Sequence, residues 1–236
     1  MAGSVYITGD KHGSFRLFFG LNERKLAAPE DIIIIAGDAG FVMDEEYPLK
    51  IHTLERLFPG TVCFVDGNHD NHEILRTLPE TEWQGGRVHR AGERVFHLMR
   101  GELYELNGEN YFTLGGARTV GNFIEDLHRW EGEEPSPEEL ERAERVFSEN
   151  LDRIDYVITH EAPLCSRGGL NRTKPLDGDY ALPDVLQEWF DRASAGARLK
   201  KWYFGHMHED RKFGPKLQAI YNQVVAAGSG TALRWH

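Results

Sequence analysis

The first third of the chain alternates short apolar runs with segments of helical periodicity. Residues 5–8, 31–36 and 61–65 are apolar and rich in β-branched side chains, which favours strands. The four consecutive isoleucines of the second run are typical of a strand buried on both faces of a parallel sheet. Between these runs the sequence predicts one helix capped by Ser14 and a second over residues 47–58, which a Pro-Gly pair ends. Strands that alternate with helices indicate right-handed parallel crossovers and an α/β fold.

The middle of the chain has a different pattern. Short runs over residues 87–89, 95–99, 103–106 and 111–114 predict closely spaced strands, with a hairpin turn at Asn107-Gly108 between the last two. We therefore expect an antiparallel stretch here and a second sheet. Residues 122–135 are polar and acidic, which favours a loop with a short helix.

The last part of the chain predicts two more helices and further strands. Ser136 stands at a cap position with Pro137 at the first helical position, followed by a capping-box glutamate. Residues 182–193 predict a second helix, and residues 155–159 and 201–205 predict strands. Residues 218–226 predict a closing hairpin around Asn222. Since the chain shows no internal repeat or linker, we expect a single domain over residues 1–236.

The composition is that of a globular protein with a full core. The chain has 236 residues, of which 40% are hydrophobic and 28% are charged. No apolar run reaches the length of about 18 residues that a membrane span needs, and we expect no signal peptide because no basic and apolar leader precedes the first strand. Cys63 and Cys165 are the only cysteines, which excludes a disulfide framework and favours the cytoplasm.

The formal net charge of -11 argues against a basic surface that binds nucleic acid or other polyanions. It does not argue against a phosphate substrate, because the local charge of a site decides which substrate it binds.

Five short polar motifs follow or end apolar runs of the sequence. They are Gly9-Asp10-Lys11-His12-Gly13, Gly37-Asp38-Ala39-Gly40, Gly67-Asn68-His69-Asp70, Thr159-His160-Glu161-Ala162-Pro163 and Gly205-His206-Met207-His208. In open α/β sheets, ligands bind at the carboxyl ends of the strands, where these motifs are expected. Carboxylates combined with imidazoles suit manganese, iron, zinc or nickel better than magnesium. The motifs therefore predict a site for two divalent cations.

Several polar residues near the motifs have more ordinary interpretations. The histidines at positions 52, 72, 89, 97, 128 and 236 lack motif context, and we expect them at the surface or half-buried. Lys11 is expected to face solvent rather than substrate. For Arg118, Arg167 and Arg172 we favour surface salt bridges over contact with a substrate phosphate.

The five motifs, in order and spacing, resemble the calcineurin-like metallophosphoesterase superfamily from Gly9 to His208. The resemblance implies a four-layer sandwich of two mixed β-sheets flanked by α-helices. It implies one metal ion held by Asp10, His12, Asp38 and His208, and a second held by Asp38, Asn68, His160 and His206. Asp38 would bridge the two ions. We expect Mn²⁺, with iron, zinc and nickel as alternatives.

The resemblance also implies a reaction. A metal-bridging hydroxide would attack the phosphorus of a monoester or diester in line, and His69 would act as general acid. Apart from the resemblance, Asp70 and Glu73 are the two nearby carboxylates that could orient His69.

The serine/threonine protein phosphatases of this superfamily carry Asp and Arg shortly after the bridging aspartate, where this chain has Phe41 and Val42. We therefore favour a small ester, such as a nucleotide derivative, over a phosphoprotein. A non-catalytic metal-binding scaffold of the same fold is a further alternative, which the retained His69 disfavours. The natural substrate and the oligomeric state stay open.

Overall fold

The computed structural model describes residues 3–119, 130–170 and 179–235, and every structural statement below concerns these residues. Its helices are α1 (Arg16–Glu23), α2 (Tyr47–Leu57), α3 (His72–Thr77), α4 (Pro137–Glu149), α5 (Leu164–Arg167) and α6 (Leu182–Ala195). Its strands up to the middle of the chain are β1 (Val5–Thr8), β2 (Ile32–Ala36), β3 (Thr61–Val65), β4 (Glu80–Trp83), β5 (Gly86–Arg90), β6 (Val95–Leu98), β7 (Glu102–Leu106) and β8 (Glu109–Leu114). The remaining strands are β9 (Tyr156–Thr159), β10 (Lys201–Phe204), β11 (Arg211–Phe213), β12 (Leu217–Ala219) and β13 (Val224–Ala226).

The strands form two mixed sheets. The first sheet has the order β13-β1-β2-β3-β6-β5-β4, and the second has the order β11-β12-β10-β9-β8-β7. In the first sheet β1, β2, β3 and β6 run parallel, while β13, β5 and β4 pair antiparallel. In the second, β8, β9, β10 and β12 run parallel, and β7 and β11 pair antiparallel at the edges.

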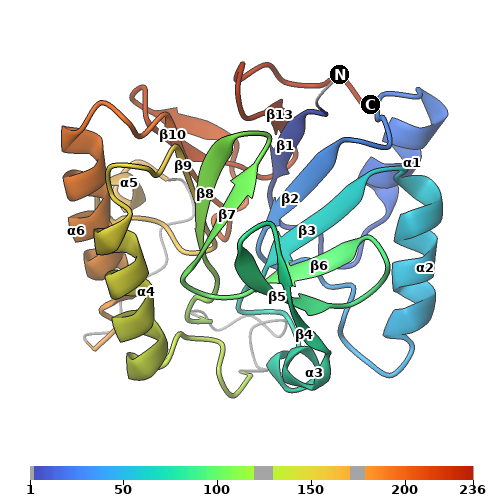
Figure 1. Ribbon diagram of the computed structural model, residues 1–236, viewed down its shortest axis with the longest axis horizontal. Helices are drawn as coiled ribbons and strands as arrows, with labels where there is room; N and C mark the ends of the chain where they lie inside the picture. Colours follow the sequence, from blue (N-terminus) through green and yellow to red (C-terminus); the bar gives the residue numbers. More distant parts are fainter. Residues whose placement is uncertain (1–2, 120–129, 171–178, 236) are drawn as a thin grey trace.

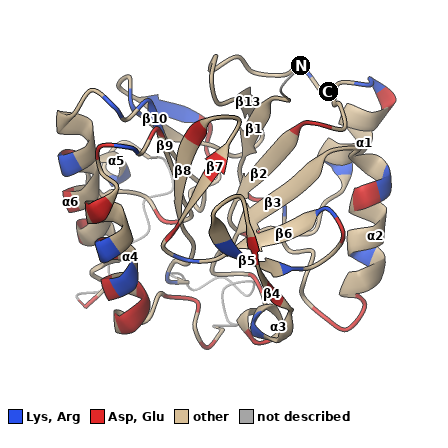
Figure 2. Ribbon diagram, viewed as in Figure 1, with Lys and Arg blue, Asp and Glu red and all other residues tan. Residues whose placement is uncertain are grey.

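Three apolar clusters hold the layers together. One lies between the sheets and joins Ile34 of β2 to Tyr156 of β9 and Tyr203 of β10. A second packs the outer face of the first sheet, including Ile33 and Ile35, against α1 and α2. The third packs the outer face of the second sheet against α4 and α6. Figure 1 shows the resulting order of helices, sheet, sheet and helices, which confirms the predicted four-layer sandwich. Figure 2 shows Lys, Arg, Asp and Glu on the outer helices, on loops and on strands such as β7 and β10, whereas β1 and β2 carry none.

Local sequence signals predicted most elements correctly. The strands at residues 5–8 and 61–65 have the predicted bounds, and successive isoleucines of β2 alternate between the two faces of the first sheet. Asn107 and Gly108 both have positive φ, of 53° and 79°, as the predicted hairpin turn requires. Ser136 forms the predicted capping box with Glu139.

Four expectations were wrong or incomplete. Residues 218–226 do not form a hairpin, because β12 pairs with β10 while β13 pairs with β1 in the other sheet. The middle strands are divided: β5 and β6 belong to the first sheet, and only β7 and β8 to the second. Ser14 does not cap α1, whose N-cap position is occupied by Phe15 without a side-chain hydrogen bond. The strands β4 and β11 and the helices α3 and α5 were missed. Most of the loop predicted at 122–135 lies outside the described residues.

Within the described ranges, no helix is both long enough and apolar enough to cross a membrane.

Candidate metal centre

The predicted ligands follow the carboxyl ends of parallel strands from both sheets. Asp10, Asp38 and Asn68 stand two or three residues after the ends of β1, β2 and β3 of the first sheet. His160 follows β9 of the second sheet, and His206 and His208 follow β10. Several contacts between these side chains join the sheets, so the site lies where the carboxyl edges of the two sheets meet.

One group of four side chains can hold a metal ion. Asp10, His12, Asp38 and His208 each offer one ligand atom, and these atoms all lie within 4.8 Å of one another. His208 Nε2 lies 3.0 Å from Asp10 Oδ2 and 3.1 Å from His12 Nε2. Two donors that share one cation at about 2.1 Å lie about 3–4 Å apart, so the observed spacing fits a shared ion. This is the group that the family resemblance implies for the first ion.

The predicted ligands of the second ion are more deeply buried than those of the first. His160 Nε2 is 3.0 Å from Asn68 Oδ1 and 3.5 Å from Asp38 Oδ2. The rings of His160 and His206 lie 5.0 Å apart between centroids, nearly edge to face. Asn68, His160 and His206 are all buried. The His12 side chain, in contrast, is 40% exposed, so the site opens to solvent on the side of the first group.

His160 is oriented for ligation through its Nε2 atom. Its Nδ1 lies 2.9 Å from the carbonyl oxygen of Ala36, which fixes Nδ1 as the hydrogen-bond donor. Burial disfavours the imidazolium, but the adjacent carboxylates of Asp38 and Asp10 outweigh it and raise the pKa of His160 to about 10. For Asp38, burial would raise the pKa, but the neighbouring His160, His69 and His12 hold it well below its usual range.

The Oδ2 atom of Asp38 decides whether the residues suit a cation. This atom is buried and receives no well-formed hydrogen bond from the described residues, although the Nε2 atoms of His160 and His12 lie 3.5 and 3.9 Å away. A buried carboxylate oxygen without a donor costs free energy unless a cation occupies its free side. Since Asp38 belongs to the group of four donor residues, the surroundings of this oxygen suit a divalent cation.

Left-handed backbone is concentrated in this site. His12, Asp38, His206 and His208 have φ of 46°, 48°, 62° and 50°, a conformation that costs a non-glycine residue about 1 kcal/mol. Among the described non-glycine residues only three others have positive φ. Strained backbone persists where the surrounding structure imposes it, which happens most often at functional sites.

The model of the family described as calcineurin-like phosphoesterase matches residues 3–210. The chain belongs to this family. The match covers all five motifs and confirms the resemblance on which the ligand sets were based.

Solved structures show the same fold. One similar crystal structure has a TM-score of 0.56 at 14% identity, and the match covers 99% of this chain and 98% of the other. The protein TT1561 of Thermus thermophilus has a TM-score of 0.52 at 11% identity, with coverage of 99% and 98%. Identities this low show a likeness of fold alone. No curated protein matches the sequence.

The motif glycines of this family member allow a close approach of the loops. A Cβ atom at Gly67 would lie 2.1 Å from Asp38 Oδ1, and a Cβ atom at Gly37 would lie 1.9 Å from His160 Nδ1. Any side chain at either position would displace a predicted ligand. The glycines are therefore part of the site's geometry.

His69 and Asp70 both bind the loop that carries Asp38. The backbone N–H of His69 donates to Asp38 Oδ1 at 2.8 Å, and the His69 ring lies 5.7 Å from that of His12, on the open side of the site. The Asp70 carboxylate accepts from the N–H groups of Ala39, Gly40 and Gly67. Burial and the nearby Asp38 raise the pKa of Asp70 to about 7. Asp70 thus ties the second motif to the third, while its predicted action on His69 stays a prediction.

Lys11 does not face solvent as predicted. It is buried, and its Nζ donates to the carbonyl oxygen of Tyr221 at 2.8 Å. Burial lowers its pKa to about 8 despite the nearby carboxylates of Asp10 and Asp210. Asp210 accepts from the backbone N–H groups of residues 221–223 and so holds the segment that crosses between the sheets. The Tyr221 ring stacks on His208 at 4.7 Å between centroids, a contact that sequence reasoning missed.

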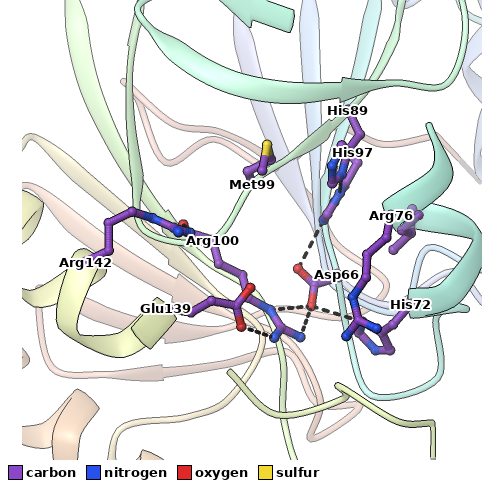
Figure 3. Close-up of a pocket in the computed structure, with 10 residues that line it drawn as sticks. Asp66, His72, Arg76, His89, His97, Met99, Arg100, Glu139 and Arg142 are labelled. Carbon is purple, nitrogen blue, oxygen red and sulfur yellow. Dashed lines mark hydrogen bonds and ion pairs between the residues drawn. The ribbon is translucent and has the colours of Figure 1, made fainter. Parts of the chain in front are cut away.

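A buried cluster of charged and polar side chains lies next to the third motif and binds its backbone. Asp66 accepts from Arg100 Nη2 at 2.6 Å and lies 3.1 Å from His97 Nε2, while His72 Nε2 donates to Gly67 O at 3.0 Å. Figure 3 shows Asp66 between these side chains, which come from α3, β6 and the segment after it. The neighbouring cavity of about 50 Å³ is far smaller than the roughly 300 Å³ of a typical ligand pocket. The expectation that His72 and His97 are surface or half-buried residues was wrong, because both are buried at this cluster.

This cluster predicts a loss of stability in weak acid. His89 adjoins the cluster, since its Nδ1 lies 2.9 Å from His97 Nδ1. Burial lowers the pKa of both His72 and His89 to about 4, so these residues are neutral in the folded protein over a pH range where the unfolded chain binds protons. Stability should therefore fall as pH drops from about 6.5, the unfolded value, towards about 4. Urea unfolding at a series of pH values should show a shallower decline for His89→Gln and His72→Gln than for the wild type. The exposed His52 on α2 provides the control, since His52→Gln should keep the wild-type slope. An unchanged slope in all variants would contradict the expectation.

Two of the three arginines that were expected to form surface salt bridges, Arg118 and Arg167, do pair with carboxylates. Arg167 is buried, and its Nη1 donates to Glu161 Oε1 at 2.7 Å, so it is not the surface residue that was expected. Arg118 makes the expected salt bridges, to Glu134 and to Asp179, both at 2.6 Å. Arg172 lies outside the described residues.

Proposed function

We propose that the chain is a binuclear metal-dependent phosphoesterase that hydrolyses a small phosphate monoester or diester. The observation that carries this proposal is the convergence of donor side chains from the first, fourth and fifth motifs on the Asp38 carboxylate, whose Oδ2 atom is buried. Family membership supports the reaction class.

The residues would divide between two cations that share Asp38. Asp10, His12 and His208 would complete one site, and Asn68, His160 and His206 the other. When bound, the cations would lower the pKa of a coordinated water towards about 7 and neutralise the charge of the phosphoryl oxygens during in-line attack. We propose Mn²⁺, with iron, zinc and nickel as alternatives that the same nitrogen and oxygen donors accept.

His69 would protonate the leaving oxygen of the ester. Its backbone is fixed by Asp38, and its ring lies near that of His12 on the side of the site that opens to solvent. Asp70 would act less directly, by holding the loops of Asp38 and Asn68 at a fixed separation.

A small ester is the substrate class that these residues favour. Phe41 and Val42, which stand where protein phosphatases of the superfamily carry Asp and Arg, are buried in the core beside α1. They supply neither a phosphate clamp nor a partner for His69. The net charge of -11 also argues against a nucleic-acid substrate. Two free cysteines fit a reducing compartment such as the cytoplasm.

The test is a panel of chromogenic phosphate esters. Protein freed of metal by a chelator would be assayed with p-nitrophenyl phosphate and bis(p-nitrophenyl) phosphate, without metal and with Mn²⁺, Fe²⁺, Zn²⁺ or Ni²⁺. We expect turnover that depends on the added cation and increases until two ions are bound per chain. Tight binding of two cations without turnover of either ester class would favour the scaffold alternative.

A further inference from the structure

Asn68 differs from the other predicted ligands of the second cation because its orientation decides whether it can bind at all. Its amide carries an acceptor oxygen and a donor NH₂ group of nearly equal size. Only the oxygen can bind a divalent cation. A half turn of the amide would exchange the two groups without changing the space that the side chain fills.

A series of hydrogen bonds links this amide to Thr119 and Glu133. Asn68 Nδ2 donates to Thr119 Oγ1 at 2.9 Å, and Asn68 Oδ1 faces His160 Nε2 at 3.0 Å. Thr119 in turn donates twice to Glu133, from Oγ1 to Oε2 at 2.7 Å and from its backbone N–H to Oε1 at 3.0 Å. Asn68, Thr119 and Glu133 are all buried, with exposed fractions of 0%, 2% and 5%. Water therefore has little access to compete for these bonds.

The direction of each hydrogen bond in this series follows from the carboxylate of Glu133, which can only accept. A carboxylate has no proton to give, so the Thr119 hydroxyl must donate its single proton to Glu133. Its oxygen then offers only lone pairs to Asn68. If the amide were turned over, Asn68 Oδ1 would meet an oxygen that has no proton left, and two buried acceptors would face each other at the cost of a lost hydrogen bond.

Glu133 is itself held in place by the backbone around it. The N–H of Ala117 donates to its carbonyl oxygen at 3.0 Å, and Arg100 Nη2 donates to the same oxygen at 3.2 Å. The same Nη2 atom also donates to Asp66, directly before the third motif. The backbone of Glu133 and the loop of Asn68 are thus anchored to a common guanidinium.

We propose that Thr119 and Glu133 are positioning residues of the second cation site, which lock the amide of Asn68 with its oxygen towards the cation. The proposal rests on the proposed function, since it assumes that the second cation binds. It gives a role to two residues of the segment between β8 and α4 that no motif contains.

The experiment measures Mn²⁺ binding to the metal-free full chain by equilibrium dialysis, alongside ester hydrolysis. Thr119→Val keeps the shape of the side chain but removes the hydroxyl, and we expect the affinity for the second Mn²⁺ to fall by about 10–100-fold while the first ion binds normally. Thr119→Ser restores the hydroxyl and should restore the affinity. In the Glu133→Gln variant, the new NH₂ group can donate to Thr119 Oγ1. The Thr119 hydroxyl can then donate to Asn68 Oδ1 in the reversed amide. We therefore expect this variant also to bind the second Mn²⁺ more weakly.

Thr113→Val is the matched control. Thr113 is a buried threonine of β8 whose hydroxyl donates to Met99 O at 3.3 Å, so its replacement tests the loss of a buried hydroxyl outside the site. Both Thr→Val variants should lower the melting temperature, but only Thr119→Val should lose the second Mn²⁺. Should Thr119→Val fold poorly, Glu133→Gln and Thr119→Ser still decide the question.

The two proposals fail in different ways. Wild-type affinity for two Mn²⁺ ions in both Thr119→Val and Glu133→Gln would overturn the positioning role, even if the protein hydrolyses esters. The opposite outcome is also possible to observe: the wild type binds two ions tightly, Thr119→Val loses the second ion, and no ester is hydrolysed. This result would support the positioning role and overturn the proposed activity.

Discussion

Asp38→Asn is expected to prevent the binding of both cations and to lower cation-dependent ester hydrolysis by about 10³-fold or more, because several kcal/mol of charge stabilisation would be lost. The substitution keeps the size of the side chain and an oxygen that can accept from the N–H of His69, as Asp38 Oδ1 does at 2.8 Å. It removes the charge of the one carboxylate whose Oδ2 faces His12 and His160 together.

The measurement combines metal analysis of the dialysed protein with the ester assay. Asp44→Asn is the matched control, because Asp44 is an exposed carboxylate that pairs with Lys50 and belongs to none of the five motifs. This control should bind two cations and hydrolyse the esters as the wild type does. If Asp38→Asn retained two bound cations, Asp38 would not be the shared ligand, and the arrangement of the site would need to be revised.

His69→Ala is expected to keep both cations and to lower kcat by about 10²–10⁴-fold, the usual contribution of general acid catalysis. None of the cation ligands proposed here is altered by this change, and the backbone N–H that binds Asp38 is retained. The loss should be larger for an alkyl phosphate than for a nitrophenyl phosphate, since a poor leaving group depends more on protonation.

Comparing the two esters separates chemistry from structure. A general loss of folding or of cations would lower both rates alike, whereas loss of an acid affects the poor leaving group selectively. His52→Ala, at an exposed position of α2, serves as the control and should leave both rates unchanged. Near-normal turnover of the alkyl ester by His69→Ala would remove His69 from the mechanism.

The parts of the fold that follow from short-range patterns could be predicted from the sequence. A run of isoleucines indicates a strand with two buried faces whatever its neighbours are, and β2 has this environment. The predicted hairpin over residues 218–226 failed because the pairing of a strand is not a local property. Two short apolar runs separated by Asn222 suit a hairpin, but β12 and β13 find better partners in β10 and β1, which are distant in the sequence.

The candidate site shows the same division. Its proposed ligands stand in motifs, and the structure brings these residues together. The residues that support them carry no such signal. Tyr221 acts through stacking on His208, and Thr119 through a hydrogen bond to Asn68, so that only the folded chain shows either role. Lys11 was expected to face solvent, yet its side chain is buried and donates to the carbonyl oxygen of Tyr221, which is distant in the sequence.

The left-handed residues of the site have a consequence for attempts to make this protein more robust. Glycine would adopt the backbone of His12 and His208 without steric cost, so a screen that rewards heat resistance alone should accept it at these two partly exposed positions. Each such replacement would delete a donor for the cations. Heat resistance and chemistry therefore compete at these positions, and engineering should seek its gains on the outer helices instead.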